Sequence, residues 1–339
     1  MSLGLNENNE FEKKKMFILE HSDFFLNGVS IWFHLTHEQL RKYQNILEWQ
    51  YVVCNETIDW TIDIMDEFKD LIFEDGNPFN EINTNEKLPW SVEFIARFED
   101  LWIWELLAQN DQVIGDAEIR KYFHNQLDPY IDEYLEMFNN RSNGLNSSGK
   151  TFGDAVEADS LNLLLKHKEL QIMHPHEIED SDSIDWTRLS QNEFLNWSAE
   201  LIEKYIDQWD WPALSTNKSI NRNLKLIKCF EDKIDWSKDK IDADGTITFE
   251  RNNISSNDSI EWDSEILSTY VSRLNTSSIS ISANAKWNID LLIQFADFWD
   301  YWILSLNKVV WGIVFPEFNN SAYLNPILDL ILERRNINE

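Results

Sequence analysis

Residues 186–217 read WTRLSQNEFLNWSAELIEKYIDQWDWPALSTN, which is one complete sequence repeat followed by the start of the next. Trp186, Trp211 and Trp236 follow one another at intervals of 25 residues. The full repeat can be written W-x-x-L-S-x-N-x-x-x-x-W-[STDN]-x-[DE]-L-I-x-x-[YF]-x-D-x-W-x. A fixed period in this range is typical of chains built from stacked structural repeats. With 16 Trp against 9 Gly and 7 Pro, the chain uses large rings as a recurring structural element.

The Asn of each repeat marks the period along the chain. It recurs at Asn55, Asn85, Asn110, Asn192, Asn217, Asn257 and Asn307, with Ser282 in the same place. A Trp follows this position by five residues at Trp60, Trp90, Trp197, Trp262 and Trp287, and Arg222 takes its place after Asn217. Most steps are 25 residues, but the step from Asn55 is 30 and the step from Asn217 is 40.

The second half of each repeat predicts a capped helix. A residue that favours the N-cap follows the Trp each time, at Thr61, Ser91, Ser198, Asp263 and Asn288. An acid comes two residues later, which suits the positive end of a helix dipole. The Trp and an apolar residue inside the helix then form a hydrophobic staple.

The first half, W-x-x-L-S-x-N, is too short for a long helix. Asp210-Trp211-Pro212 reads as a cap followed by a Pro in the first turn, which predicts a short α-helix or 3₁₀ turn. We expect the Asn to turn the chain toward the next repeat through hydrogen bonds of its amide to the backbone.

These patterns predict an all-α fold, a helical-repeat solenoid of Trp-rich repeats with a small β-hairpin insertion. The alternative is a leucine-rich-repeat-like α/β solenoid, since L-S-x-N partly matches that pattern. The predicted segments are an N-terminal cap (1–45), Trp-rich repeats (46–110), an interrupted helical segment (111–183) with a mobile loop (139–154), further repeats (184–315) with a hairpin insertion (238–256), and a C-terminal capping helix (316–339). Within the last, Asn325 is the expected N-cap and Pro326 the first turn.

LPWSVEFIARFEDLWIWELLAQN (88–110) and NWSAELIEKYIDQWDWPALSTN (196–217) resemble the tryptophan-rich W-x-x-L-S-x-N repeats, about 25 residues long, of uncharacterised bacterial proteins. The resemblance covers roughly 46–110 and 184–311. It implies no catalytic residue, ligand or cofactor. The chain departs from the pattern in 111–183, in the insertion after Trp236, and at Arg222.

Two segments match parts of the sequence patterns of known ligand-binding loops. GLNSSGKT (144–151) fits the phosphate-loop pattern through Gly144, Gly149, Lys150 and Thr151. No apolar strand precedes it, however, so a mobile loop between helices is the favoured interpretation. DADGTI (242–247) copies the middle of an EF-hand loop, but Lys240 and Arg251 stand where oxygen ligands belong. A hairpin that turns at Asp244-Gly245 explains the same residues better.

No other cluster of side chains predicts a catalytic or metal site. His34 and His37, or His174 and His176 with Glu177 and Asp180, could chelate a metal, but their spacing matches no helical metal motif. The two cysteines, Cys54 and Cys229, predict neither a disulfide framework nor a zinc site and suit a reducing cytoplasm. The sequence predicts no signal peptide and no membrane span.

Charge narrows the classes of partner. The chain has 29 Lys and Arg against 60 Asp and Glu, a net charge of −31. This charge repels nucleic acids and anionic membranes and favours a basic protein. We therefore expect a non-enzymatic scaffold without cofactor that binds a basic protein, with an antitoxin-like inhibitor as one version. The alternatives are an NTP-binding enzyme acting through 144–151 and an aromatic groove for a small ligand or glycan. The oligomeric state is not predicted.

Overall fold

The computed structural model of the chain describes residues 3–73, 80–131, 186–195, 197–221, 228–236, 240–241, 247–248 and 253–338. These residues belong to two compact lobes. Lobe 1 contains the described residues of 1–143, 288–293 and 301–339, and lobe 2 contains those of 144–287 and 294–300.

Lobe 1 is built from helices at both ends of the chain. Its N-terminal elements are α1 (Leu3–Glu20), α2 (Ser22–Trp32), α3 (His37–Tyr43), α4 (Trp49–Val52), α5 (Ile62–Ile72), α6 (Asn80–Thr84), α7 (Val92–Arg97), η2 (Glu99–Leu101), α8 (Trp104–Leu107), α9 (Asp111–Gly115) and α10 (Ala117–Tyr122). Its C-terminal elements are α20 (Ile289–Gln294, whose last residue belongs to lobe 2), α21 (Tyr301–Ser305), α22 (Lys308–Ile313), η4 (Pro316–Asn319) and α23 (Ser321–Asn338).

Lobe 2 is built from short helices and one pair of short strands. Its helices are α13 (Trp186–Gln191), α14 (Ala199–Lys204), α15 (Trp211–Thr216), α16 (Lys218–Asn221), η3 (Ile254–Ser256), α18 (Ser264–Tyr270) and α19 (Thr276–Ile281). The strands β1 (Lys240–Ile241) and β2 (Ile247–Thr248) pair antiparallel inside the segment where the hairpin insertion is expected, with Ile241 opposite Ile247.

The described residues confirm the all-α fold class. The L-S-x-N segments form short helices, as in α13 and α15, so the prediction of a leucine-rich-repeat-like α/β fold is wrong. Asp210 caps α15 by accepting from Ala213 N at 3.1 Å, with Pro212 in the first turn as expected. Each expected cap of a longer helix also accepts the backbone N–H three residues on, as Thr61 does from Ile64 at 3.2 Å; the others are Ser91, Ser198, Asp263 and Asn288.

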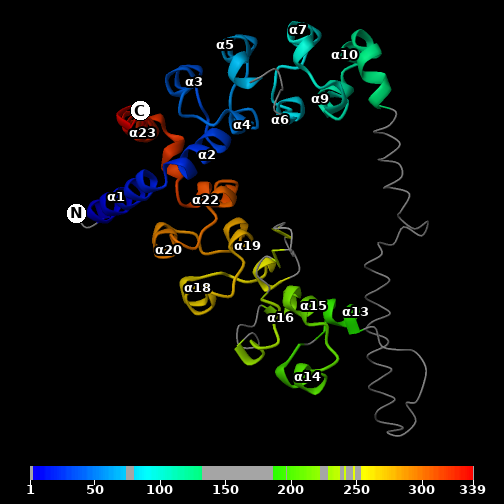
Figure 1. Cartoon of the computed structure of the whole chain (residues 1–339), viewed down its shortest axis with the longest axis vertical. Coiled ribbons are helices and arrows are strands. Elements are labelled where there is room, and N and C mark those ends of the chain that lie inside the picture. The colour runs from blue at the N-terminus through cyan, green and yellow to red at the C-terminus, as the bar shows by residue number, and fades with distance from the viewer. Residues whose placement is uncertain are drawn as a thin grey trace. The chain divides into compact units, whose positions relative to one another are not determined.

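The short helices of lobe 1 follow one another in a row that does not keep the order of the sequence. The helix α2 contacts α21 on one side and α4 on the other, and α6 contacts α8. The helices α4 and α6 belong to this row, and the capped helices α5 and α7 lie along one side of it (Figure 1). Segments from the two ends of the chain are therefore neighbours in lobe 1.

Close packing joins α2 to α22. Gly28 lies in α2 directly against Trp311, and a Cβ built on Gly28 would fall 1.8 Å from that ring. The Trp311 ring stacks on Phe24 at 4.8 Å and meets Phe33 edge-on at 5.7 Å. Because no larger side chain fits at Gly28, this contact needs a glycine in the middle of a helix.

The C-terminal helix begins earlier than expected. It starts at Ser321, so Pro326 lies inside α23, and the expectation that Asn325 caps the helix is wrong. Asn320 caps it instead, accepting from Ala322 N at 2.9 Å. Asn325 is used in tertiary contact: its Oδ1 accepts from Gln39 Nε2 at 2.7 Å.

Candidate interaction surface

The repeated Asn of L-S-x-N forms two kinds of hydrogen bond. In Asn55, Oδ1 accepts from Thr57 N at 2.8 Å, and Nδ2 donates to Ser30 O of α2 at 2.8 Å. The same pair of bonds, between 2.8 and 3.1 Å, is made by Asn85, Asn110, Asn217 and Asn257. The first bond confirms the expected turn. The second joins successive repeats, and sequence reasoning did not find it.

The Ser of L-S-x-N adds a second link between repeats. Ser190 Oγ donates to Trp186 O at 2.7 Å and accepts from Asp210 N, 20 residues later, at 3.0 Å. Ser215 does the same with Trp211 O and Asp235 N. These serines and asparagines are buried, so the repeats that they link in the described part of the chain are joined by polar groups that have no access to water.

Most of the Trp rings are core residues. Ten of the 16 are buried: Trp49, Trp60, Trp102, Trp197, Trp209, Trp236, Trp262, Trp287, Trp299 and Trp311. Four of the five rings that precede the capped helices donate from Nε1 to the carbonyl five residues back, at 2.9 Å in Trp60, Trp90, Trp197 and Trp287. Trp262 is the exception. Trp302 is the exposed ring, with 56% of its surface accessible.

A row of exposed carboxylates follows the Asn positions of lobe 1. Glu56, Glu86 and Asp111 each come directly after a bonded Asn, and all three are exposed. Because the Asn side chains link successive repeats, these carboxylates lie on the same edge of three repeats. None of them forms an ion pair with another described residue. We call these three residues the acidic edge.

Two arginines of the neighbouring capped helices are already paired. Arg41 of α3 contacts Glu67 of α5 at 2.5 Å, and Arg97 of α7 contacts Asp66 of α5 at 2.5 Å. The hydrogen bond from Arg41 lowers the pKa of Glu67 to about 2, and that from Arg97 lowers the pKa of Asp66. Residues 49–73 and 80–131 contain 16 Asp and Glu against 5 Lys and Arg, so a large excess of carboxylates stays at this surface.

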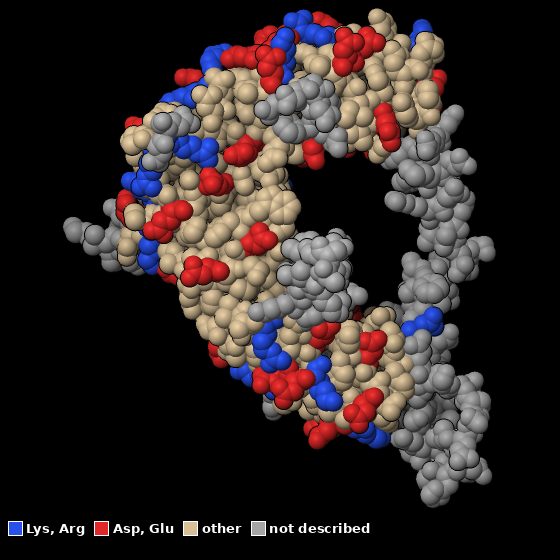
Figure 2. Space-filling model, in the orientation of Figure 1, with Lys and Arg blue, Asp and Glu red and all other residues tan. Residues whose placement is uncertain are grey.

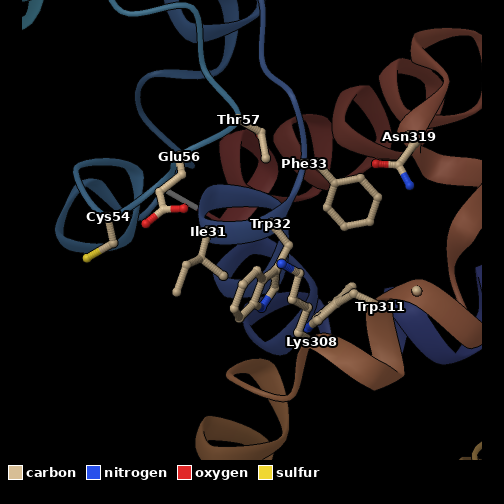
Figure 3. A pocket seen from close by; sticks show the side chains of 10 residues that line it. Ile31, Trp32, Phe33, Cys54, Glu56, Thr57, Lys308, Trp311 and Asn319 are labelled. Atoms are coloured by element: carbon tan, nitrogen blue, oxygen red, sulfur yellow. The ribbon is translucent and has the colours of Figure 1, made fainter. Parts of the chain in front are cut away.

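A pocket of about 360 Å³ lies in lobe 1 where α2, α22 and the segment after α4 meet. Figure 3 shows Trp32 and Phe33 near its middle, with Lys308 beside Trp32. Glu56 lies toward Cys54 and Ile31, and Asn319 lies on the opposite side, beyond Phe33. Lys308 Nζ lies 5.6 Å from the Trp32 ring centroid, which is a cation–π distance. The pocket combines an aromatic surface with one carboxylate and one ammonium group.

His34 and His37, the histidines that the sequence analysis considered as a metal site, do not come together in the described part of the chain. His34 Nδ1 lies 2.5 Å from Thr57 O, and His37 Nε2 lies 2.7 Å from Glu67 Oε2, so the two histidines have separate partners. No group of three or more His, Cys, Asp or Glu could hold a metal in this part of the chain. Burial raises the pKa of Cys54 to about 11, which disfavours the reactive thiolate.

Several candidates lie outside the described residues. These are Gly144, Gly149, Lys150 and Thr151, the histidine cluster His174, His176, Glu177 and Asp180, and the middle of the hairpin. In the part of the chain that is described, no helix is long and apolar enough to cross a membrane.

The sequence contains a pattern that could have shown that the segment around Ser30 is also a repeat. Ser30 and Trp32 stand in Gly-Val-Ser-Ile-Trp (28–32), which aligns with Ala-Leu-Ser-Thr-Asn (213–217). Trp32 Nε1 donates to Ser305 O at 2.9 Å, as the Asn of other repeats donates to the preceding Ser carbonyl. No protein-family model, curated protein or solved structure matches the chain.

Proposed function

We propose that the protein is a non-enzymatic scaffold that binds a basic protein through the acidic edge. The observation that supports this most directly is the row of Glu56, Glu86 and Asp111, which are exposed, unpaired among the described residues, and placed at equal positions of successive repeats. An inhibitor of a basic effector, comparable to an antitoxin, is the specific version of this proposal. Cytoplasmic location belongs to the same proposal.

Electrostatics supports a basic protein over other partners. The net charge of −31 raises the local concentration of cationic partners and repels nucleic acids and anionic membranes. Figure 2 shows carboxylates at many places on the face in view, with Lys and Arg among them. Association should be fast and sensitive to salt, because charges at an exposed surface are screened.

The proposal includes a solenoid arrangement and membership of the chain among the Trp-rich repeat proteins. The hydrogen bonds between repeats support both. Five of the Asn side chains, together with Ser190 and Ser215, link one repeat to another through the same kinds of hydrogen bond. Repeat arrays of this kind hold extended surfaces in fixed register, and their usual role is to bind another macromolecule. A rigid spacing of carboxylates would select a partner whose cations have a matching spacing.

The test is capture of partners from the native host with the whole protein at low and high salt. We expect a basic protein to bind at low salt and to be released at high salt. The triple variant Glu56→Lys, Glu86→Lys, Asp111→Lys should lose it. The matched control, Glu12→Lys, Glu20→Lys, Glu333→Lys, changes the net charge equally at exposed acids of α1 and α23 and should keep it.

Two outcomes would count against the proposal. If no protein binds at either salt concentration, the scaffold has no partner of this kind. If both triple variants lose the partner equally, net charge alone decides binding and the acidic edge has no special role.

The alternatives make different predictions. An NTP-binding enzyme would show a thermal shift with Mg-ATP or Mg-GTP that Lys150→Ala removes. Ten Trp rings are buried in the core, so few ring faces are left to stack on a glycan. The pocket at Trp32 is the candidate site for a small ligand.

A further inference from the structure

The pocket beside Trp32 arises from a shortened segment in one repeat. In the repeat that follows α4, the helix cap Thr61 is the sixth residue after the bonded Asn55. The same spacing holds from Asn85 to Ser91. In the repeat of α2, Trp32 takes the place of the Asn, and the cap Thr36 comes only four residues later. The edge of lobe 1 is therefore recessed between the repeats on either side.

The walls of this recess come from those neighbouring repeats. Glu56 follows Asn55 on one side, and Lys308 follows Asn307 on the other. Ile31, Trp32 and Phe33 form the surface between them. Figure 3 shows the Glu56 carboxylate on the Cys54 and Ile31 side of the pocket, away from Lys308, which lies near the Trp32 ring.

The pocket has the size and lining of a side-chain site. Its volume of about 360 Å³ exceeds that of a single aromatic side chain and lies within the usual range of ligand pockets. Aromatic lining favours an apolar or aromatic group. Glu56 is exposed and forms no ion pair with a described residue, so it can accept a cation from the ligand, whereas Lys308 is occupied over the Trp32 ring.

We infer that this pocket binds a short peptide segment of the basic partner, in which an aromatic side chain enters beside Trp32 and an adjacent Arg or Lys pairs with Glu56. The inference rests on the proposed function, because it takes the partner to be a basic protein. The aromatic residue would supply specificity at one point, while the rest of the acidic edge supplies salt-dependent attraction.

Gly312 makes a sharp test possible. It lines the pocket from α22, and a Cβ built on it has no atom within 4 Å. Gly312→Leu therefore adds a side chain to the lining of the pocket at a position where its Cβ meets no neighbouring atom. Gly115 in α9 has the same free surroundings far from the pocket in sequence, so Gly115→Leu is the matched control.

The experiment is calorimetric titration of the whole protein with acetyl-Arg-Trp-Arg-amide, acetyl-Arg-Ala-Arg-amide and acetyl-Glu-Trp-Glu-amide. We expect the first peptide to bind about tenfold or more tightly than the second, since burial of a large ring is worth that factor. Gly312→Leu should weaken the first peptide about tenfold, and Glu56→Gln about threefold to fivefold. Gly115→Leu and Glu12→Gln, which lies outside the acidic edge at an exposed acid of α1, should leave its affinity unchanged.

The outcomes separate this inference from the proposed function. Equal affinity for the Trp and Ala peptides, or an affinity that Gly312→Leu does not change, would overturn the pocket assignment. If binding of both basic peptides is equal and falls with salt, the acidic surface still attracts cations and only the pocket inference fails. Stronger binding of the Glu peptide would overturn the role of Glu56.

Discussion

Two Trp side chains at the same position of adjacent repeats differ in one hydrogen bond. Trp287 Nε1 donates to Ser282 O at 2.9 Å, whereas Trp262 Nε1 is buried without a partner among the described residues. Replacement by Phe removes the indole N–H and the same amount of ring surface at both positions. Only in Trp287→Phe does it leave a carbonyl without its donor.

We therefore expect Trp287→Phe to lower the free energy of unfolding by about 1–2 kcal/mol more than Trp262→Phe. Urea denaturation of the two variants and the parent protein measures this difference. A larger loss in Trp262→Phe would mean that its Nε1 does have a partner.

At the scale of elements, the contact between α2 and α22 depends on a glycine. A methyl group at Gly28 would overlap the Trp311 ring, whose Cζ2, Cε2 and Cη2 lie 1.8 to 2.3 Å from its position. Trp311 is 3% exposed and surrounded by Phe24, Phe33 and Phe315, so it cannot move freely. The two helices could not keep their present spacing.

Gly28→Ala should lower the free energy of unfolding by about 1–3 kcal/mol, although Ala favours a helix. Gly312→Ala is the control in α22, because its Cβ meets no atom within 4 Å and Ala is expected to be neutral or to stabilise by up to about 1 kcal/mol. Thermal and urea unfolding of both variants provide the comparison. Equal stability of the two would show that α2 and α22 are not packed this closely.

The ion pair between α3 and α5 predicts a dependence on pH. The hydrogen bond from Arg41 lowers the pKa of Glu67 from its ordinary 4.5 to about 2 in the folded state. The pair therefore stabilises the fold fully above pH 4.5, and this contribution is lost as the pH falls from 4.5 toward 2. Because the pair is exposed to solvent, its effect should be modest and smaller at high salt.

The difference in melting temperature between the protein and Glu67→Gln measures this effect. We expect the variant to melt at the lower temperature near pH 6, and the difference to shrink as the pH falls from 4.5 toward 2. A difference that stays constant over that range would show that Glu67 is not held in its charged form by Arg41.

At the scale of the whole molecule, local features could be predicted from the sequence and the arrangement of lobe 1 could not. Caps such as Thr61 and the turn at Asn55 depend on neighbouring residues, so their types and spacing predict them. The link from Trp32 to Ser305 joins residues 273 positions apart and depends on the fit of Gly28 to Trp311. The pocket lies beside this contact between Trp32 and Ser305. The sequence analysis did not recognise that Trp32 takes the position of the repeated Asn, so it did not predict the pocket.

The first and last segments of the chain share one core in lobe 1, which can be tested by truncation. Phe318 is fully buried, with its ring 5.4 Å from Phe25 and 5.9 Å from Phe11. Tyr43 donates to Asp329 Oδ1 at 3.0 Å. Further buried residues of the C-terminal segment are Leu324, Ile327, Leu328 and Ile331. Burial of five such side chains is worth on the order of 10 kcal/mol, as much as the total stability of many domains.

A chain that ends at Phe315 should therefore lose hydrogen-exchange protection throughout α1, α2 and α3, while α18 and α19 of lobe 2 keep theirs. A chain that ends at Asn336 is the control, because it removes the exposed Ile337 and should keep protection in both lobes. If the shorter chain retained protection in α1 to α3, the N-terminal helices would fold without α23. Loss of protection in lobe 1 alone would show that the two ends of the sequence complete one structural unit.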